Sequence, residues 1–386
     1  MLGLLFAMVG LVPGQGEAHP YAASTDAGTF VAITTHDAEV VGALVEDTGR
    51  IPWDSTFQIA AYEGWYGAPP VAASGDGDFI VAWGDAPDYL LAVRFARVGT
   101  DGSVGPVGAR TGDDPAVAGG RTCNRGRCVD RSFLLVRHVG GISSRIVGSF
   151  GGGEDFVILD GGSAPSVAWD GNSYLVVATV VGKARASASS CTYLGPCVPA
   201  STWLSTSAHI VAVRVLPDGS VLSPVPVATA AAVGRCASIS WTECGPPAGG
   251  WLVAAGARLF ESGSVRPVVA AGPSGFLVVW SESSRIRAAR ISSEGLLVDP
   301  LPSELGEGTH PAVAWMGERF AVAWTSPAAD PPQVHGVHVD PSGAVEDPFS
   351  IEDATHPTVT RTAGGGTAVV TWRPSDEHFW LEEIQA

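Results

Sequence analysis

Lysine is almost absent from this chain of 386 residues: Lys183 is its only one, and the other basic residues are arginines. Lys and Arg together number 22 against 39 Asp and Glu, so the net charge is −17. An acidic surface repels phosphate backbones and anionic lipid headgroups. We therefore expect no nucleic-acid partner and no docking on an anionic membrane.

A long apolar run is also missing at the N-terminus, where Met1 to Val12 form a short one (LGLLFAMVGLV). It is too short to span a bilayer. Small residues follow it, and Gly16-Glu17-Ala18 offers a cleavage site before His19. The pattern is typical of a secretory signal peptide, although no Lys or Arg precedes it. We predict a signal peptide over residues 1–18, a secreted, periplasmic or cell-surface location, and no membrane insertion after cleavage.

Cysteine is scarce, and the six cysteines fall into three close pairs: Cys123 with Cys128, Cys191 with Cys197, and Cys236 with Cys244. An even number in local pairs favours short disulfides formed in an oxidising compartment. The alternative is a metal site. The pairs lie far apart in sequence and lack the C-x-x-C spacing of zinc modules, so we favour disulfides.

Helical periodicity is lacking throughout, whereas hydrophobic residues make up 46% of the chain and charged residues 16%. This composition is too apolar for disorder. Glycine (49) and proline (28) are abundant and spread along the chain, which indicates many tight turns. Short strands joined by such turns predict an all-β protein.

One pattern of about 46 residues recurs. Pro267-Val-Val-Ala leads to Gly275-Phe-Leu-Val-Val-Trp280, then to Ile286-Arg-Ala-Ala-Arg-Ile291. Pro311-Ala-Val-Ala-Trp315 leads likewise to Phe320-Ala-Val-Ala-Trp324. The eight copies start at residues 20, 70, 115, 165, 237, 267, 311 and 357. The copy at 237 is short and the last one stops after its third strand, which leaves seven copies as the alternative to eight.

Each copy predicts four strands, which we name a to d. Strand b, as in Phe276 to Trp280, is continuously apolar, which indicates burial on both faces. A sheet of this size needs neighbours to bury two faces, and a closed ring supplies them to every copy. We predict one β-propeller domain over residues 19–386, of eight or alternatively seven four-stranded blades. Tandem β-sandwiches and a β-solenoid are the competing architectures.

The P-x-V-A-W and F-x-V-x-W motifs of these copies resemble the repeats of uncharacterised bacterial secreted β-propeller repeat proteins. The resemblance covers nearly the whole chain after residue 18. It implies the fold, and it implies no activity.

Unusual residues gather at the predicted end of the ring that carries the b–c and d–a turns. Aromatic residues that do not recur between copies are candidates for stacking on a sugar or a partner side chain: Trp65, Tyr66, Tyr193 and Trp203. The last two belong to a long b–c insertion, residues 182–208. At the opposite end, Arg125 and Arg127 lie in a hairpin between Cys123 and Cys128, where they could bind carboxylates or sulfates.

Three histidines directly precede the first proline of a copy: His19, His310 and His356. The copies are neighbours once the ring closes, so the imidazoles could converge on the central channel and bind zinc or copper. The competing explanation is a turn preference inherited by duplication. Other copies carry Asp114, Ala164 or Arg266 at this position, and Asp114 is the only acidic residue there.

Catalytic motifs are missing: the chain has no G-x-S-x-G, no H-E-x-x-H and no phosphate-binding glycine loop. Our leading hypothesis is a non-enzymatic, extracytoplasmic scaffold that binds a protein or glycan ligand, without a cofactor and as a monomer. A polysaccharide hydrolase or lyase, which would need two carboxylates converging in the channel, and a structural cell-surface protein are the alternatives.

Overall fold

The structure is a computed structural model, and it describes residues 20–25, 28–34, 39–45, 49–51, 56–61, 71–74, 78–85, 91–124, 127–139, 141–147, 155–190, 198–230, 265–326, 330–362, 366–376 and 378–384. The predicted signal peptide lies outside these residues. In the described part of the chain, no helix is long and apolar enough to cross a membrane.

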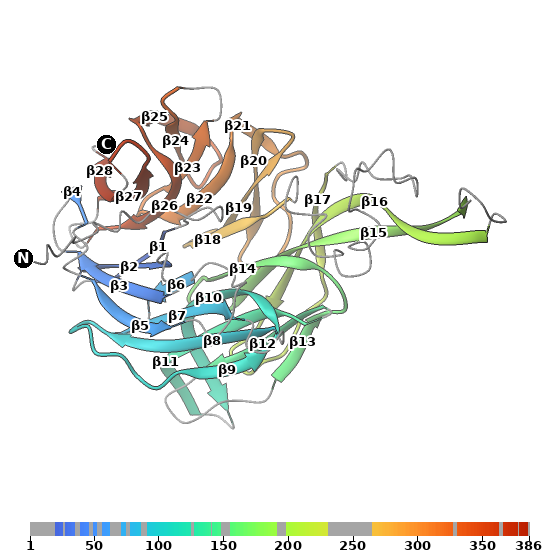
Figure 1. Cartoon of the computed structure of the whole chain (residues 1–386), viewed down its shortest axis with the longest axis horizontal. Coiled ribbons are helices and arrows are strands. Elements are labelled where there is room, and N and C mark those ends of the chain that lie inside the picture. The colour runs from blue at the N-terminus through green and yellow to red at the C-terminus, as the bar shows by residue number, and fades with distance from the viewer. Residues whose placement is uncertain are drawn as a thin grey trace, which may run out of the picture.

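Seven four-stranded antiparallel sheets surround a common centre (Figure 1). We number these blades 1 to 7 along the chain. The first three run from the inner to the outer strand as follows: blade 1, β1 (Tyr21–Thr25), β2 (Gly28–Thr34), β3 (Glu39–Val45) and β5 (Phe57–Ala61); blade 2, β6 (Val71–Ser74), β7 (Asp78–Asp85), β8 (Ala92–Gly99) and β9 (Gly108–Thr111); blade 3, β10 (Asp113–Asn124), β11 (Arg127–His138), β12 (Ile142–Val147) and β13 (Asp155–Leu159).

The remaining four blades follow the same order: blade 4, β14 (Ser163–Trp169), β15 (Tyr174–Ser190), β16 (Val198–Val215) and β17 (Val225–Ala230); blade 5, β18 (Val268–Gly272), β19 (Gly275–Glu282), β20 (Arg285–Ser292) and β21 (Ser303–Glu307); blade 6, β22 (Thr309–Trp315), β23 (Phe320–Ser326), β24 (Gln333–Val339) and β25 (Val345–Glu352); blade 7, β26 (Thr355–Arg361), β27 (Thr367–Arg373), β28 (His378–Ile384) and β4 (Gly49–Arg50). The chain is therefore a β-propeller, as the sequence predicted.

The second strand of each blade is buried because neighbouring blades cover both of its faces. The continuously apolar run of β19 shows this: Phe276, Val278 and Trp280 pack toward blade 4, whereas Leu277 and Val279 pack toward blade 6. Seven hydrophobic clusters fill the seven spaces between adjacent blades, and together they close the ring. The repeated tryptophans of this strand are core residues, since Trp83 and Trp280 have no exposed surface.

Blades number seven, so the favoured count of eight was wrong and the alternative of seven is confirmed. The additional copy predicted at Ala237 would lie between blades 4 and 5. These two blades pack directly on each other, with Val177 and Ile210 of one in the same cluster as Val269 and Phe276 of the other. No blade can therefore stand between them, and residues 231–264 lie outside the described residues.

The ring closes with a strand that comes from inside blade 1. β4 lies between β3 and β5 in sequence, yet it pairs with β28 of the last blade through Arg50 opposite Trp380. The next residue, Ile51, donates its backbone N–H to the carbonyl of Phe379 at 2.9 Å. Its side chain is 3% exposed and packs between blades 7 and 1. The last sequence copy lacked a fourth strand because this segment supplies it.

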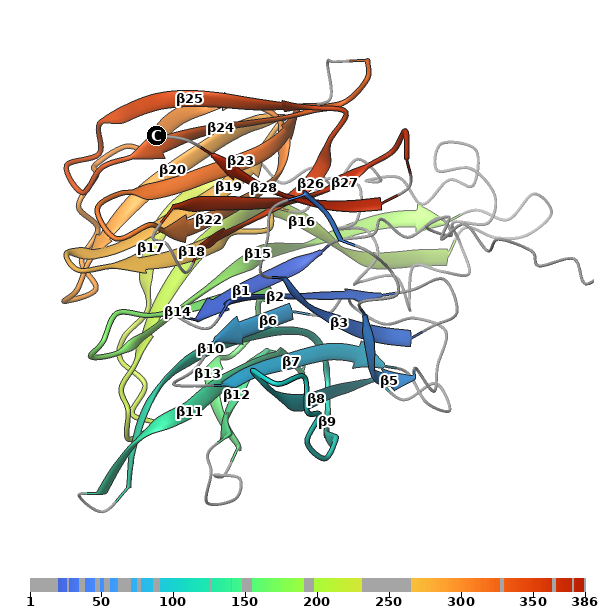
Figure 2. The same cartoon turned by 90° about the vertical axis from the view of Figure 1, so that its left-hand side faces the viewer.

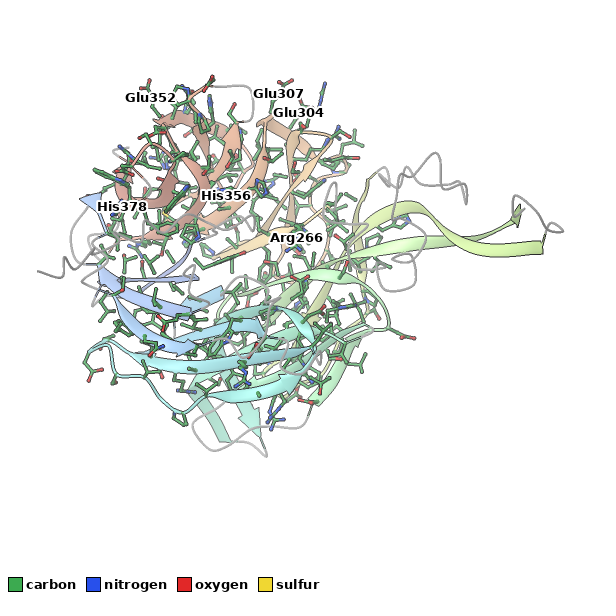
Figure 3. All side chains as sticks on the ribbon, in the orientation of Figure 1. Arg266, Glu304, Glu307, Glu352, His356 and His378 are labelled. Atoms are coloured by element: carbon green, nitrogen blue, oxygen red, sulfur yellow. The ribbon has the colours of Figure 1, made fainter. Side chains whose placement is uncertain are left out.

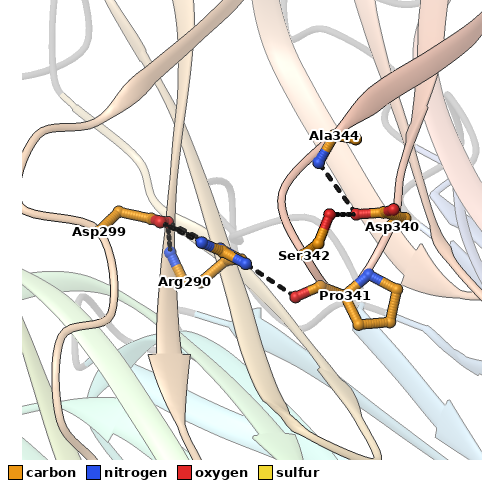
Figure 4. A network of polar contacts seen from close by, with 6 residues as sticks. All are labelled: Arg290, Asp299, Asp340, Pro341, Ser342 and Ala344. Atoms are coloured by element: carbon orange, nitrogen blue, oxygen red, sulfur yellow. Dashed lines mark hydrogen bonds and ion pairs between the residues drawn. The ribbon is translucent and has the colours of Figure 1, made fainter.

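A polar contact joins blades 5 and 6 at the end that carries the c–d turns (Figure 4). Arg290 of β20 forms an ion pair of 2.6 Å with Asp299 and donates from a guanidinium nitrogen to the carbonyl of Pro341 in blade 6 at 2.8 Å. Asp340 holds the turn that presents Pro341, because its Oδ1 accepts from the backbone N–H of Ala344 at 2.9 Å. Gly343, in the same turn, has a φ of 95°, and a Cβ added to it would lie 3.0 Å from Cζ of Arg290.

Candidate functional site

Inner strands of four blades share a β-bulge where the recurrent proline begins the repeat. In β22, His310 and Pro311 together face a single residue of β23, because the pairing shifts between Thr309 and Ala312. The same shift occurs in β10, β14 and β26. The residue before each proline has a left-handed φ of about 50°, namely Asp114, Ala164, His310 and His356. In these four blades the repeat thus sets one bulged position at the d–a end of the inner strand.

Side chains of residues that precede the recurrent proline also meet between blades that are not adjacent. Arg266 precedes Pro267 of blade 5, and its guanidinium lies 3.5 Å from Oδ1 of Asp114 in blade 3. The ion pair passes over blade 4, whose Ala164 N–H donates to Oδ2 of Asp114 at 2.9 Å. The Asp114 side chain is 25% exposed and that of Arg266 is 58% exposed. Figure 3 places Arg266 toward the middle of the ring.

Burial raises the pKa of the Asp114 carboxyl, while the charge of Arg266 opposes that rise. Burial also raises the pKa of Tyr21, whose hydroxyl senses both Arg266 and Asp114. Tyr21 belongs to blade 1, so groups from blades 1, 3 and 5 act on one another. Titratable groups with shifted pKa values that gather in one place are typical of binding and catalytic sites.

A histidine and a carboxylate extend this group along blade 3. Nδ1 of His138 lies 2.8 Å from Oδ1 of Asp113, the residue beside Asp114. Asp113 raises the pKa of His138 through this hydrogen bond, against the opposing effect of burial. The two residues are paired across the strands β10 and β11, so the sheet itself fixes their contact.

The predicted histidine pair is adjacent. The rings of His310 and His356, in blades 6 and 7, have centroids 4.7 Å apart at an interplanar angle of 55°. His19, the third predicted metal ligand, lies outside the described residues. Among the described residues, no group of three or more His, Cys, Asp or Glu side chains could hold a metal ion. The three-histidine site therefore stays a prediction. We name Tyr21, Asp113, Asp114, His138, Arg266, His310 and His356 together the central cluster.

Hydroxyl groups at the end of the second strand hold neighbouring blades together beside this cluster. Thr179 of blade 4 donates to the carbonyl of Val265 at 2.5 Å, and Ser281 of blade 5 donates to that of Gly308 at 3.0 Å. Thr325 of blade 6 accepts the backbone N–H of His356 at 2.9 Å. Each contact lies within three residues of the next blade's proline, so it fixes the start of that blade's inner strand to the preceding blade.

The insertion at residues 182–208 forms part of a ribbon that continues blade 4. The pairing of β15 with β16 runs on from Gly182 opposite Ser207 to Ser190 opposite Val198. We name this part, residues 182–190 with 198–207, the arm. It extends roughly 30 Å at ~3.3 Å per residue, and it leaves the body of the ring in Figure 1. It continues the b–c end of the blade, the end at which the central cluster lies.

The backbone of Trp203 belongs to the arm, where it pairs with Arg185. The other aromatic candidates, Trp65, Tyr66 and Tyr193, lie outside the described residues, as do Cys191, Cys197, Cys236 and Cys244. The structure thus places one of the four aromatic positions on an element.

The predicted hairpin at the opposite end is confirmed. β10 and β11 pair to their tip, with Cys123 directly opposite Cys128 and Asn124 opposite Arg127. Figure 2 shows this hairpin and the arm leaving the ring in opposite directions. Cysteines that face each other across antiparallel strands are close enough for a disulfide, which stays a prediction for this pair. Arg125 lies outside the described residues.

Sequence reasoning identified part of the central cluster. Asp114, Arg266 and the two histidines all precede a recurrent proline, and that position was the available signal. The ion pair between Arg266 and Asp114 was missed because it joins blades that are not adjacent. Tyr21 and His138 carried no signal, since each is an ordinary strand residue until the ring brings it to the others.

The sequence matches no family model and no curated protein. Solved structures similar to it in fold include the β-propeller domain of the Trilobed protease from Pyrococcus furiosus, at 9% identity over 96% of this chain and 97% of that one, with a TM-score of 0.44. The SapL1 lectin, solved with alpha methyl fucoside, matches at 13% identity over 85% of this chain and 94% of its own, with a TM-score of 0.44.

A putative 6-phosphogluconolactonase from Bacteroides fragilis matches at 11% identity over 95% of this chain and 90% of its own, with a TM-score of 0.47. At these identities the likeness concerns the fold alone.

Proposed function

We propose that this protein is a non-enzymatic scaffold that binds a glycan or protein ligand at the b–c and d–a end of the propeller. The observation that carries the proposal is the arm, a ribbon that extends one blade at the end where the central cluster lies. A rigid ring that carries one irregular extension is suited to recognition, because the ring fixes the geometry and the extension supplies specificity.

Within this proposal, the ligand contacts are the non-recurrent aromatic residues Trp65, Tyr66, Tyr193 and Trp203. Aromatic rings offer large apolar faces for sugars and protein side chains. Arg125 and Arg127, on the hairpin at the other end, would form a second contact region for acidic groups.

The test is a panel of polysaccharides incubated with the chain from residue 19 onward, scored for depletion of protein and for release of soluble sugar. Depletion without release supports a binder. In a matched variant, residues 184–204 are replaced by an Asn-Gly turn between Lys183 and Ser205, which are paired in the arm. This variant keeps blade 4 and should lose the binding. Binding that survives removal of the arm would contradict the proposal.

A polysaccharide hydrolase or lyase is the second candidate, and the Asp114 carboxyl favours it. A carboxyl whose pKa is raised by burial, next to an arginine and a tyrosine, has the character of a general acid. Sugar release in the same panel, abolished by Asp114→Asn and retained in Asp299→Asn, would support this candidate against the first.

We propose that the protein acts outside the cytoplasm as a monomer after loss of residues 1–18. N-terminal sequencing of the exported protein should begin at His19, and sedimentation should give the mass of one chain. An intact residue 1 in the exported protein would contradict the proposed cleavage.

A further inference from the structure

Arg266 is placed to bind a ligand. Its side chain is 58% exposed, and its contact with Asp114 is long at 3.5 Å, compared with roughly 2.7–2.9 Å for a strong charge-assisted hydrogen bond. A guanidinium carries five N–H donors in a planar fork, and one such contact leaves most of them able to reach another group.

Basic residues of three consecutive blades share the position of Arg266 in the repeat. His310 and His356 directly precede the recurrent proline in the next two blades around the ring, as Arg266 does in blade 5. Figure 3 shows Glu304, Glu307 and Glu352 at the outer edge of the ring, whereas Arg266 and His356 lie toward its middle. Among the described carboxylates, Asp114 contacts Arg266, and its neighbour Asp113 is engaged by His138. An anion bound by Arg266 would thus lie at the same end of the ring as these imidazoles, which carry positive charge when protonated.

We propose that Arg266 recognises the carboxylate of a small ligand, such as a uronic acid, bound over the centre of the ring. The fork of the guanidinium matches the two oxygens of a carboxylate. A singly charged group also suits the site better than a phosphate, because a second negative charge would face Asp113 and Asp114. This inference rests on the proposed binding function and adds to it the chemistry of the ligand.

Binding would exchange one partner of Arg266 for another. The ligand carboxylate takes the place of Oδ1 of Asp114, while Oδ2 of Asp114 keeps the N–H of Ala164. Asp114 then loses its counter-charge and gains an anionic neighbour, so it takes up a proton from solvent. Tyr21, Asp113 and His138 are the described titratable groups that interact with Asp114 or Arg266. Protonation of His138, and of His310 and His356 at the same end of the ring, would also favour the anion. Binding should consequently strengthen as the pH falls toward the ordinary range of carboxyl groups.

The experiment is calorimetric titration with D-galacturonate, with its methyl ester and D-galactose as uncharged counterparts. N-acetyl-alanine presents a carboxylate from a peptide source, and inorganic phosphate is the doubly charged comparison. The proteins are the wild type, Arg266→Gln and Arg285→Gln. Arg285 is a matched control because it is an exposed arginine of the same blade that pairs with Glu304 at the outer edge.

We expect galacturonate or acetyl-alanine to bind the wild type, and Arg266→Gln to weaken binding by at least about tenfold, as the loss of a hydrogen-bonded charge pair implies. Arg285→Gln should bind as the wild type does. Binding by the sugar acid alone would assign an acidic glycan, and binding by both carboxylates would assign the carboxylate itself. The uncharged probes and phosphate should bind more weakly than the carboxylates.

Three results would overturn the inference: no binding of either carboxylate, equal binding of the uncharged probes or phosphate, or undiminished binding by Arg266→Gln. If polysaccharides of the panel bind and any of these results is also obtained, the proposed function stands and the carboxylate assignment fails.

Asp114→Asn supplies a second variant, since the asparagine side-chain oxygen can still accept the backbone N–H of Ala164. It should bind galacturonate at least as tightly as the wild type and take up fewer protons, measured in buffers of different ionisation enthalpy.

Discussion

Trp280 of blade 5 packs against blade 4 and so contributes to the interface between the two blades. It ends the buried run of β19, has no exposed surface, and packs among Ala168, Ile210 and Val227 of blade 4. We expect Trp280→Ala to lower the free energy of unfolding by about 3–5 kcal/mol, because it leaves a large cavity at a blade interface. Chemical denaturation measures this change. Trp315→Ala is the matched control at a half-buried position of an inner strand, and it should cost clearly less.

His138 gives the stability of the protein a dependence on pH. Its pKa is raised by the hydrogen bond to Asp113. The folded state therefore holds this proton more tightly than the unfolded chain does, and the stabilisation is complete below the ordinary histidine pKa of 6.5. It is lost as the pH rises through the folded pKa, since both states are then deprotonated.

Asp113→Asn should lower the pKa of His138 and flatten this dependence. Urea unfolding of the wild type and the variant at about pH 5.5 and about pH 8.5 measures the change in stability. NMR titration of the His138 ring measures the pKa directly. An unchanged titration midpoint in Asp113→Asn would show that the hydrogen bond does not control this proton.

Elements differ in how far the sequence could predict them. The second strands were predictable because burial on both faces leaves a continuous apolar run, ended in several copies by a tryptophan. The arm was not predictable as strands, since residues 183–190 (KARASASS) lack the apolar alternation of a half-buried sheet. The closing strand β4 has two residues, and its partner Trp380 is more than three hundred residues away, so no local pattern could indicate it.

The central cluster also contains residues that the sequence pointed to and a contact that it could not indicate. The position before the recurrent proline pointed to His310 and His356 as neighbours, because adjacent copies become adjacent blades. The pairing of Arg266 with Asp114 depends on the distance across the ring, and that distance follows from the number of blades rather than from any motif. The wrong count of eight would have separated blades 4 and 5 and changed which residues face each other.

The closing segment offers a test at the level of the element. Ile51 lies between two strands of blade 1 in sequence and packs against Trp372, Phe379 and Leu381 of blade 7. Ile51→Ala should lower the free energy of unfolding by about 2–5 kcal/mol, as for other buried aliphatic truncations. Val345→Ala, at a position that is 46% exposed on the outer strand of blade 6, is the control and should be nearly neutral. Equal effects in the two variants would mean that this segment does not close the ring.

The whole molecule is held together by interfaces between neighbours, and each of the seven blades buries its faces only because the ring is complete. An additional copy could bury its own faces only if it were inserted between two blades. The net charge of the chain is −17, whereas Arg266, His310 and His356 place three basic residues directly before the recurrent prolines of blades 5, 6 and 7. The fold thus provides both the rigidity and the local charge on which the proposed binding depends.

The number of blades leads to a prediction for residues 231–264, which join blade 4 to blade 5. Polar contacts cross this interface directly: Thr179 donates to the carbonyl of Val265, and the N–H of Val269 donates to Oγ of Ser166 at 3.2 Å. Replacing residues 231–264 by a Gly-Ser linker of equal length should therefore leave the ring folded, with a Tm close to that of the wild type. Circular dichroism during heating measures this.

A second replacement provides the contrast. In this variant the β18–β19 hairpin, residues 268–282, is replaced by a Gly-Ser linker of equal length, which removes the inner and second strands of blade 5. Cooperative unfolding should then be abolished, because blades 4 and 6 lose the neighbour that buries their faces. If the 231–264 replacement were as damaging as that of 268–282, those residues would have to contribute to the core between blades 4 and 5, and the seven-bladed ring would not be sufficient for folding.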